Sequence, residues 1–339
     1  MKGKKRKKKG VIKLIVSLLL AVAVTISLIV TNFFVPVRYL GAYINFKKDR
    51  IAPSTMRVRF IDVGYGDSTL VEFPDGKTML IDAGTGTYAN IHKLLKILNS
   101  SGIDKLDYLV CTSVKSEHCG GLDEIVKYKP VGTAFIPYVV NRNITDEYAA
   151  FYSSLSANGV VTEIVEYGKG VYNTEYGYRF FFLSPTTHAL PDSEYNQMNV
   201  SPTSENIDAA SVVMWLEYSG NGFLFLSDSS ASVQDKVART MIAENNKYVF
   251  DGLQFTLSKC VFATVANHCG ANFLHADLFG VFQPESAIVS VGKNAAGCPS
   301  LTEIAAIQQY VGERLYRTDL SGTVTVTVAN GQYSVGKEI

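Results

Sequence analysis

The sequence is poor in cysteine and histidine, and these shortages limit how a site could be built. Five of the 339 residues are cysteine, with no CxxC pair, and five are histidine. An odd number of cysteines argues against a simple disulfide framework in an exported domain and leaves at least one thiol free or in an intermolecular bond. The chain also lacks a fixed-period repeat and any low-complexity segment beyond its Lys-rich start.

Acidic side chains are nearly absent from the first 50 residues, which hold twelve Lys and Arg but a single acid, Asp49. Because the whole chain has 32 basic and 31 acidic side chains, the remainder carries a net charge of about −10. Such a domain does not attract nucleic acid unless its basic groups are clustered. We interpret the basic tail, residues 1–13, as an orientation signal with some affinity for anionic lipid.

An uncharged, apolar run of 21 residues, Leu14 to Phe34, follows the basic tail. It is long enough to cross the roughly 30 Å hydrocarbon core of a bilayer. A cleaved signal peptide is the alternative, but its apolar region would be about 7 to 15 residues long and end at a small-residue cleavage site. The sequence therefore predicts a membrane anchor at 14–35, with the N-terminus cytoplasmic and the rest of the chain extracellular. No second run of spanning length follows.

After a stalk expected over 36–55, residues 56–338 are expected to form one domain of strands and helices in two similar halves. The expected strands are 57–63, 68–73, 78–81, 106–112, 133–140, 160–165, 178–183, 211–218, 222–226, 260–266, 287–291, and a closing pair, 314–317 and 322–328. The expected helices are 90–98, one after Gly121, 145–158, 233–245, 273–282 and 301–311. This order predicts two packed sheets with helices outside them.

The loop TSVKSEHCGGL, residues 112–122, joins an apolar strand to a helix, and such loops collect catalytic groups. Further blocks follow the same order and spacing as in one family: FIDVGYGDSTL, LIDAG, FLFLSDS, VANHCGANF, VSVGKNAAGCPS and YRTDLSGTVTVT. They resemble the extracytoplasmic metallo-beta-lactamase-like domain of ComEC competence proteins, over about residues 56–338. The resemblance implies an alpha-beta/beta-alpha four-layer sandwich whose metal site lies in the loops along one edge of the sheets.

The resemblance also implies where metal ligands would stand in the first loop. The family's His-x-His/Asp-x-Asp-His cluster falls on Ser113, Lys115, Glu117 and His118. The first two positions serve mainly one metal ion, and an ammonium group does not bind a cation. Lys115 would place its own charge there and offset the carboxylates. The other two positions serve the second ion, and both keep side chains that bind metals.

The second half of the chain supplies the remaining positions of the resemblance. Asp228 matches the carboxylate that bridges or completes the site, and His268 matches the first histidine of a His-His-Gly block. One complete ligand set for a zinc or manganese ion would then be Glu117, His118, Asp228 and His268. Asp228 and Lys115 are the candidate catalytic groups.

Three cysteines lie near these positions. Cys269 and Cys298 stand where the family has histidines, and Cys119 adjoins His118. One hypothesis places Cys119 and Cys269 within disulfide or shared-ligand distance. The alternative is three unrelated buried thiols, since cysteine is commonly buried.

Structural roles are the alternatives for the other candidates. Asp228 could be the N-cap of the following helix. His118 and His268 could cap loops. The remaining acidic residues near glycines are assigned to turns and their hydrogen bonds: Asp62, Asp67 and Asp82.

Two functions therefore stay open. The first is a non-catalytic relative, with a degenerate metal site, that binds an extracellular ligand or protein partner. The alternative is a mononuclear metal-dependent hydrolase of the phosphodiesterase or nuclease type. The replacement of two ligand positions, above all by Lys115, favours the first, and the site then holds no ion. The resemblance implies DNA as a substrate, but the acidic domain does not support nucleic-acid binding.

Overall fold

Two large β-sheets form the centre of the protein. The computed structural model describes residues 13–27, 37–44, 49–139, 145–185, 204–250 and 252–338. The first sheet has the strand order β17-β16-β1-β2-β3-β4-β5-β6. Its strands are β1 Thr55–Phe60, β2 Thr69–Glu72, β3 Thr78–Ile81, β4 Leu106–Val110, β5 Val131–Ile136, β6 Val161–Ile164, β16 Val324–Ala329 and β17 Gln332–Lys337.

The second sheet has the order β15-β14-β13-β10-β9-β8-β7, and a separate hairpin pairs β11 with β12. These strands are β7 Gly170–Asn173, β8 Tyr178–Ser184, β9 Val213–Tyr218, β10 Asn221–Phe225, β11 Lys247–Phe250, β12 Leu253–Thr256, β13 Lys259–Thr264, β14 Ser286–Val289 and β15 Leu315–Arg317. β10, β13, β14 and β15 run parallel, as do β3 to β6 in the first sheet. Parallel neighbours need crossover connections, which the helices supply.

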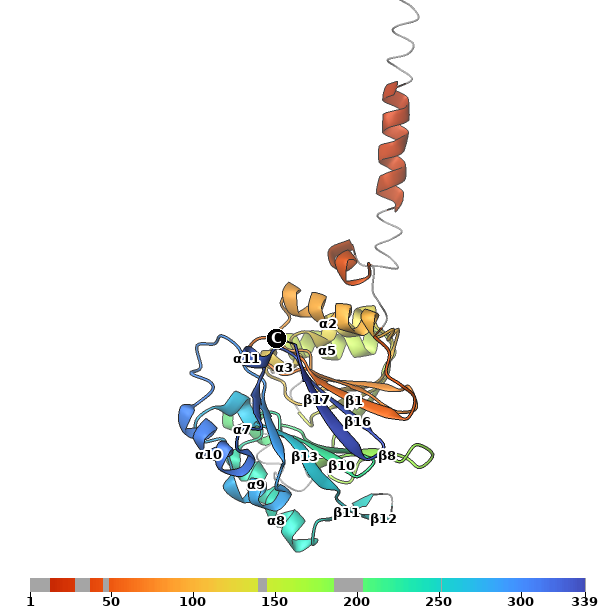
Figure 1. Cartoon of the computed structure of the whole chain (residues 1–339). Helices are drawn as coiled ribbons and strands as arrows, with labels where there is room; N and C mark the ends of the chain where they lie inside the picture. The colour runs from red at the N-terminus through yellow and green to blue at the C-terminus, as the bar shows by residue number, and fades with distance from the viewer. Residues whose placement is uncertain are drawn as a thin grey trace, which may run out of the picture.

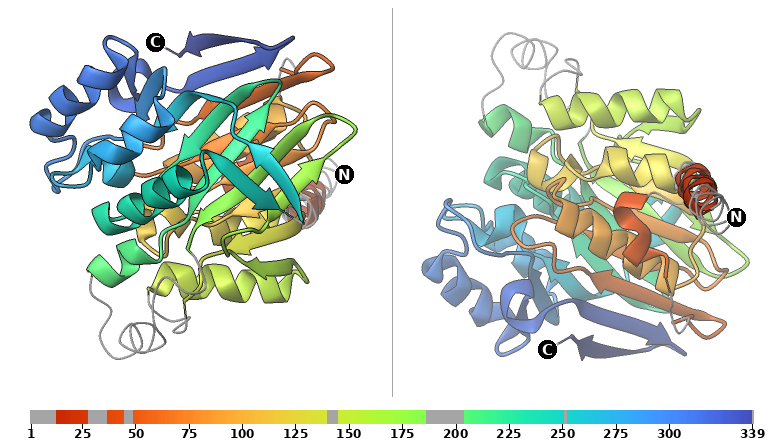
Figure 2. Two further views of the ribbon diagram at one scale, coloured as in Figure 1. Left: turned by 90° about the horizontal axis from the view of Figure 1, so that it is seen from below. Right: turned by 90° about the horizontal axis from the view of Figure 1, so that it is seen from above.

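Helices cover the outer face of each sheet (Figures 1 and 2). On the first sheet these are α2 Tyr88–Ser100, α4 Leu122–Tyr128 and α5 Asp146–Ala157, and on the second α8 Ala231–Ala243, α9 Ala276–Phe282 and α10 Leu301–Val311. The shorter helices are η1 Val37–Ala42, α3 Ser116–Cys119, α7 Ser204–Ala209, η2 Ala266–Cys269 and α11 Thr318–Ser321.

Three buried clusters fill the spaces between these layers. One lies between the first sheet and its helices, and another between the second sheet and its helices. The third joins the two sheets and is rich in aromatic side chains, with Phe60 stacked on Phe262 and Phe73 on Tyr178. Alternate side chains of a strand face opposite sides, so each sheet contributes to two clusters. The predicted mixed α/β fold of two packed sheets is thus confirmed.

The N-terminal anchor is not supported by the described part of the chain. Residues 13–27 form a helix with exposed side chains. In the ranges given above, no helix is both long and apolar enough to span a bilayer. Residues 28–35 of the predicted anchor, and 1–12 of the basic tail, lie outside the described residues.

Two further expectations differ from the structure. The segment expected to be a stalk contains η1, which buries Tyr39 against α2 and α4. The two closing strands do not pair with each other, because β15 joins the second sheet and β16 the first. Sheet membership depends on long-range pairing, which local apolar patterns do not encode.

Candidate metal centre

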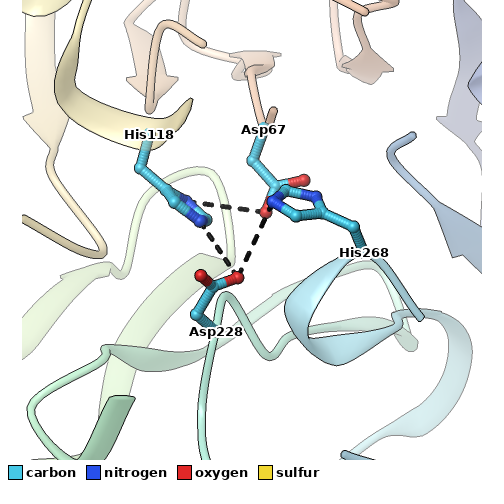
Figure 3. A group of neighbouring side chains, drawn as sticks. All are labelled: Asp67, His118, Asp228 and His268. Atoms are coloured by element: carbon cyan, nitrogen blue, oxygen red, sulfur yellow. Dashed lines mark ion pairs between the residues drawn. The ribbon is translucent and has the colours of Figure 1, made fainter. Parts of the chain in front are cut away.

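Four side chains from four separate segments of the chain meet at one edge of the two sheets (Figure 3). Asp67 lies in the turn between β1 and β2, and His118 lies on α3, just after β4. Asp228 follows β10, and His268 lies on η2, after β13. One ligand atom from each lies within 4.8 Å of the others. We call Asp67, His118, Asp228 and His268 the four-residue group.

His118 is held with one ring nitrogen facing the group. Its Nδ1 lies 2.9 Å from Asp82 Oδ2, and its Nε2 lies 3.0 Å from Asp228 Oδ1. Asp82 itself is fixed, because its carboxylate also accepts from the backbone N–H of Thr112 at 2.7 Å. Burial opposes protonation of the ring, but Asp228 and Asp82 raise the pKa of His118 well above its ordinary value.

His268 is oriented in the same way by a backbone group. Its Nδ1 donates to the carbonyl of Ser290 at 2.8 Å, which leaves the Nε2 lone pair facing Asp228 Oδ1 at 3.8 Å. The ring of Tyr65 covers it, with centroids 4.5 Å apart. The backbone of residues 267–269 has positive φ angles of 46°, 53° and 62°, and such left-handed conformations in non-glycine residues collect at functional sites.

Asp228 is fully buried and divides its two oxygens between the histidines and a lysine. Lys115 Nζ lies 2.8 Å from Asp228 Oδ2 and 2.6 Å from Asp208 Oδ1. Burial disfavours ionisation of Asp228, but the charges of His118, His268 and Lys115 hold its pKa well below its ordinary value. Burial raises the pKa of Asp208 to about 6 against the opposing charge of Lys115.

Asp67 reaches the group because its turn packs directly on α3. Its Oδ2 lies 3.6 Å from His118 Nδ1, and its backbone N–H donates to the carbonyl of Glu117 at 3.0 Å. A Cβ on Gly66 would come within 2.4 Å of that carbonyl oxygen, so only glycine permits this approach. Burial raises the pKa of the Asp67 carboxyl.

The group fits a metal ion by its buried ligand atoms. His268 Nε2 has no hydrogen-bond partner among the described residues, and His118 Nε2 and Asp228 Oδ1 contact each other at 3.0 Å. A buried polar atom without a partner is costly unless something else satisfies it. The second ring nitrogen of each histidine contacts a carboxylate or a carbonyl, as in most protein metal sites. Two imidazoles and two carboxylates suit zinc or manganese.

Three of the four ligands predicted from the sequence belong to the four-residue group, and one does not. His118, Asp228 and His268 are brought together as expected, and Lys115 lies at Asp228. Glu117 lies outside the group, and its carboxylate accepts from the Ser116 hydroxyl at 3.2 Å. The fourth member is Asp67. Sequence reasoning had assigned it to a turn.

Three other residues have roles that sequence reasoning missed or placed elsewhere. Asp82 was assigned to turn hydrogen bonds, and its carboxylate positions His118. Asp208, near the start of the second half, gave no sequence signal and pairs with Lys115. Ser113 is buried, and its hydroxyl accepts from the backbone N–H of Lys115 at 3.4 Å.

The cysteines do not join the group. All five are in described ranges and all are free, so the hypothesis of a Cys119–Cys269 disulfide is wrong for this structure. The thiol of Cys119 contacts the carbonyl of Val114 at 3.4 Å. Burial raises the pKa of the Cys269 thiol to about 12, and Cys269 is not among the side chains of the four-residue group.

The chain is similar in sequence to known proteins. Residues 61–189 match the model of the metallo-beta-lactamase superfamily. The chain is 25% identical over 295 residues to ComE operon protein 3 of Bacillus subtilis (strain 168), covering 82% of this chain and 34% of that protein. It is 36% identical over 64 residues to the anti-Pycsar protein Apyc1 of Bacillus phage 010DV004, covering 19% of this chain and 23% of that protein. The chain thus matches only about a third or less of the length of each relative.

Among solved structures, the CmlA beta-hydroxylase E377D mutant is similar with a TM-score of 0.49 and 12% identity, covering 82% of this chain and 54% of that chain. A protein described as a "putative metal-dependent hydrolase" from Parabacteroides distasonis ATCC 8503 is similar with a TM-score of 0.41 and 13% identity, covering 80% of this chain and 98% of that chain. The sequence matches and the two-sheet architecture support a metallo-beta-lactamase-type fold for this chain, with similarity to ComE operon protein 3.

Proposed function

We propose that this chain is a membrane-anchored, extracytoplasmic hydrolase of ComEC type that works with one divalent metal ion at the four-residue group. The observation that carries the proposal is the convergence of three buried ligand atoms, His118 Nε2, His268 Nε2 and Asp228 Oδ1, of which His268 Nε2 has no hydrogen-bond partner and the other two contact each other at 3.0 Å. Asp67, whose side chain is partly exposed, completes the set of four ligands. An ion held there would supply activated water near neutral pH, as hydrolysis of esters and phosphodiesters requires.

Lys115 replaces a second ion in this proposal. Its ammonium lies against Asp228 Oδ2, while the histidines face the other oxygen of the same carboxylate. The side chain therefore contributes a fixed positive charge beside the single metal and excludes another cation from that place. Because Asp208 and Asp228 offset the Lys115 charge, an anionic substrate group such as a phosphodiester would be attracted by this ammonium only together with the bound ion.

The protein's own residues hold the site in shape. Asp82 fixes the ring of His118, and the Ser290 carbonyl fixes that of His268, so that both Nε2 atoms face Asp228. Tyr65 covers the ring of His268 and shields it from water. Ligands held in this way need little rearrangement when an ion binds.

The anchor belongs to the same proposal and is supported by sequence. Residues 14–35 form an apolar run behind a basic tail, a pattern that keeps the tail in the cytoplasm and the domain outside. The net charge of about −10 that follows residue 50 favours small substrates or single esters over long nucleic acid.

A second candidate is a non-catalytic domain that binds a partner or ligand. The specific observation in its favour is that Lys115 already neutralises Asp228 at 2.8 Å and Asp208 at 2.6 Å. A carboxylate engaged by an ammonium has less charge to offer to a metal. The two candidates differ in whether an ion binds at all.

Elemental analysis separates them. We would purify the full-length protein in detergent with its thiols reduced, and measure zinc and manganese beside His118→Ala and Asp228→Ala. The hydrolase proposal expects about one ion per chain, lost in both variants, together with metal-dependent cleavage of a model phosphodiester. No bound ion after reconstitution with excess zinc or manganese would leave only the binding candidate.

A further inference from the structure

The short helix η1 is fixed to the body of the domain rather than hanging free. The ring of Tyr39 is 1% exposed, stacks on Tyr88 with centroids 5.4 Å apart, and meets the edge of Tyr128 at 5.6 Å. At the end of the helix, the side-chain amide of Asn99 donates to the carbonyl of Ala42 at 2.7 Å. In both views that show it, η1 lies over α2 on the side away from the sheets (Figures 1 and 2). Movement of η1 therefore moves the whole domain.

Very little chain separates η1 from the apolar run. The run ends at Phe34 and η1 begins at Val37. Consecutive Cα atoms are about 3.8 Å apart, so η1 starts within roughly 11 Å of the end of the run. The headgroup region of a bilayer is about 5–8 Å thick on each side. If the run spans the membrane, η1 begins at the headgroup layer.

The outward side of η1 has the composition of a membrane interface. Its exposed side chains are Val37, Arg38 and Leu40, and beside them Ile44 and Tyr88 are 54% and 48% exposed. We call these five residues the η1 face. Arg38 lies over the rings of Tyr39 and Tyr88, at 5.4 and 5.7 Å from their centroids. Aromatic rings and long basic side chains with apolar neighbours are enriched where hydrocarbon meets water.

We infer that the η1 face lies in the headgroup layer of the membrane that holds residues 14–35. Because η1 is packed on α2, this contact sets one orientation for the domain: α2 faces the membrane, and α8, α9 and the β11–β12 hairpin face away (Figure 1). The inference rests on the anchor proposed above and is independent of the metal centre.

Lipid quenching of introduced tryptophans tests this contact. Full-length protein carrying Leu40→Trp would be placed in phosphatidylcholine vesicles with or without bromine on the acyl chains. Leu253→Trp is the matched control, because Leu253 is 52% exposed and lies on β12 at the far end of the domain. The native Trp215 is fully buried and gives a constant background. Both substitutions are at exposed sites, so folding should be retained.

The expected result is roughly twofold lower emission from Leu40→Trp in brominated vesicles, since interfacial side chains lie about 5–10 Å into the boundary, with no change for Leu253→Trp. Emission from Leu40→Trp that is the same in brominated and unbrominated vesicles, in preparations where the protein floats with the vesicles, would overturn the inference and leave the anchor in place. Failure of the unmodified protein to float with vesicles would remove the anchor and the inference together. Neither outcome changes the expected metal content.

Discussion

At the scale of residues, the four-residue group contains the carboxylate of Asp67 and not that of the neighbouring Glu117. Glu117 and Asp67 lie on adjoining segments, linked by the bond from the Asp67 backbone N–H to the Glu117 carbonyl. Of these two side chains, that of Asp67 faces His118, and that of Glu117 turns to Ser116. The two residues therefore differ in role although both are acids near the same histidine.

The first prediction compares these two acids. Asp67→Asn should weaken zinc binding about 10–100-fold, because a neutral amide replaces a charged ligand. Glu117→Gln should leave affinity unchanged. Competition with a chromophoric chelator measures both. Equal losses in the two variants would mean that Glu117 is a ligand after all.

The second prediction concerns the buried charge of Lys115. Lys115→Met leaves Asp208 and Asp228 without their shared cation, and removing one partner of a buried pair costs about 3–5 kcal/mol. Adding Asp208→Asn to this variant should recover part of the loss, because one of the two carboxylates is then neutral. Urea unfolding of the metal-free protein gives the free energies. A Lys115→Met variant as stable as the original would show that the ion pair contributes nothing.

The sequence pointed to residues that the structure brings together where a motif and a metal-binding side chain coincide. His118, Asp228 and His268 lie in blocks that resemble a known family, and each has a metal-binding side chain. Asp67 lies in a glycine-rich turn, where an aspartate usually caps the backbone, so its side-chain direction was not predictable. Asp208 lies far from every motif, and only the fold brings it to Lys115.

At the scale of elements, the site depends on the close approach of the β1–β2 turn to α3. Gly66 has no room for a Cβ, because the Glu117 carbonyl oxygen would lie 2.4 Å from it. Gly76, in the next turn, also has a positive φ but has open space around it. Substituting Gly66 and Gly76 in turn therefore separates the effect of the close contact with Glu117 from the effect of a positive φ angle.

The third prediction uses this pair. Gly66→Ala should lower metal affinity about 10–100-fold, because it displaces Asp67 from the group. Gly76→Ala should destabilise the fold by about 1 kcal/mol through its positive φ and leave affinity unchanged. Isothermal titration with zinc and thermal unfolding would be measured for both. Normal affinity in a folded Gly66→Ala protein would contradict the proposed role of the turn.

Strands with strong apolar patterns were predictable and weakly patterned ones were not. β3 and α10 have the predicted bounds, Thr78–Ile81 and Leu301–Val311. β17 and the hairpin strand β12 are both exposed along most of their length, so neither shows a buried face in the sequence. η1 was missed because its anchoring contacts come from tyrosines more than 40 positions away.

At the scale of the whole molecule, a polar contact ties the two sheets at one end. Glu285 precedes β14 in the second sheet and accepts from the Tyr333 hydroxyl on β17 of the first sheet at 2.7 Å. Lys259 on β13 donates to the other oxygen at 3.1 Å. Burial opposes ionisation of Glu285, but Tyr333 and Lys259 lower its pKa below the ordinary 4.5.

The fourth prediction follows from the direction of this shift. A lowered pKa in the folded state gives stability that is present above pH 4.5 and is lost as pH falls through the folded value. Glu285→Gln should therefore lower the melting temperature at neutral pH and have less effect in acid, where both proteins carry a neutral group. Glu313→Gln, at an exposed position, is the control. A melting difference that persists unchanged in acid would argue against this charge contribution.

Anomalous diffraction at the zinc edge, from crystals of the protein grown with zinc, tests the central claim most directly. The account predicts one strong peak about 2.0–2.1 Å from the Nε2 atoms of His118 and His268, with carboxylate oxygens of Asp228 and Asp67 at about 2.0–2.2 Å. Lys115 should still contact Asp228, with no second peak beside it. No peak at the four-residue group, or one that displaces Lys115, would contradict the one-metal site.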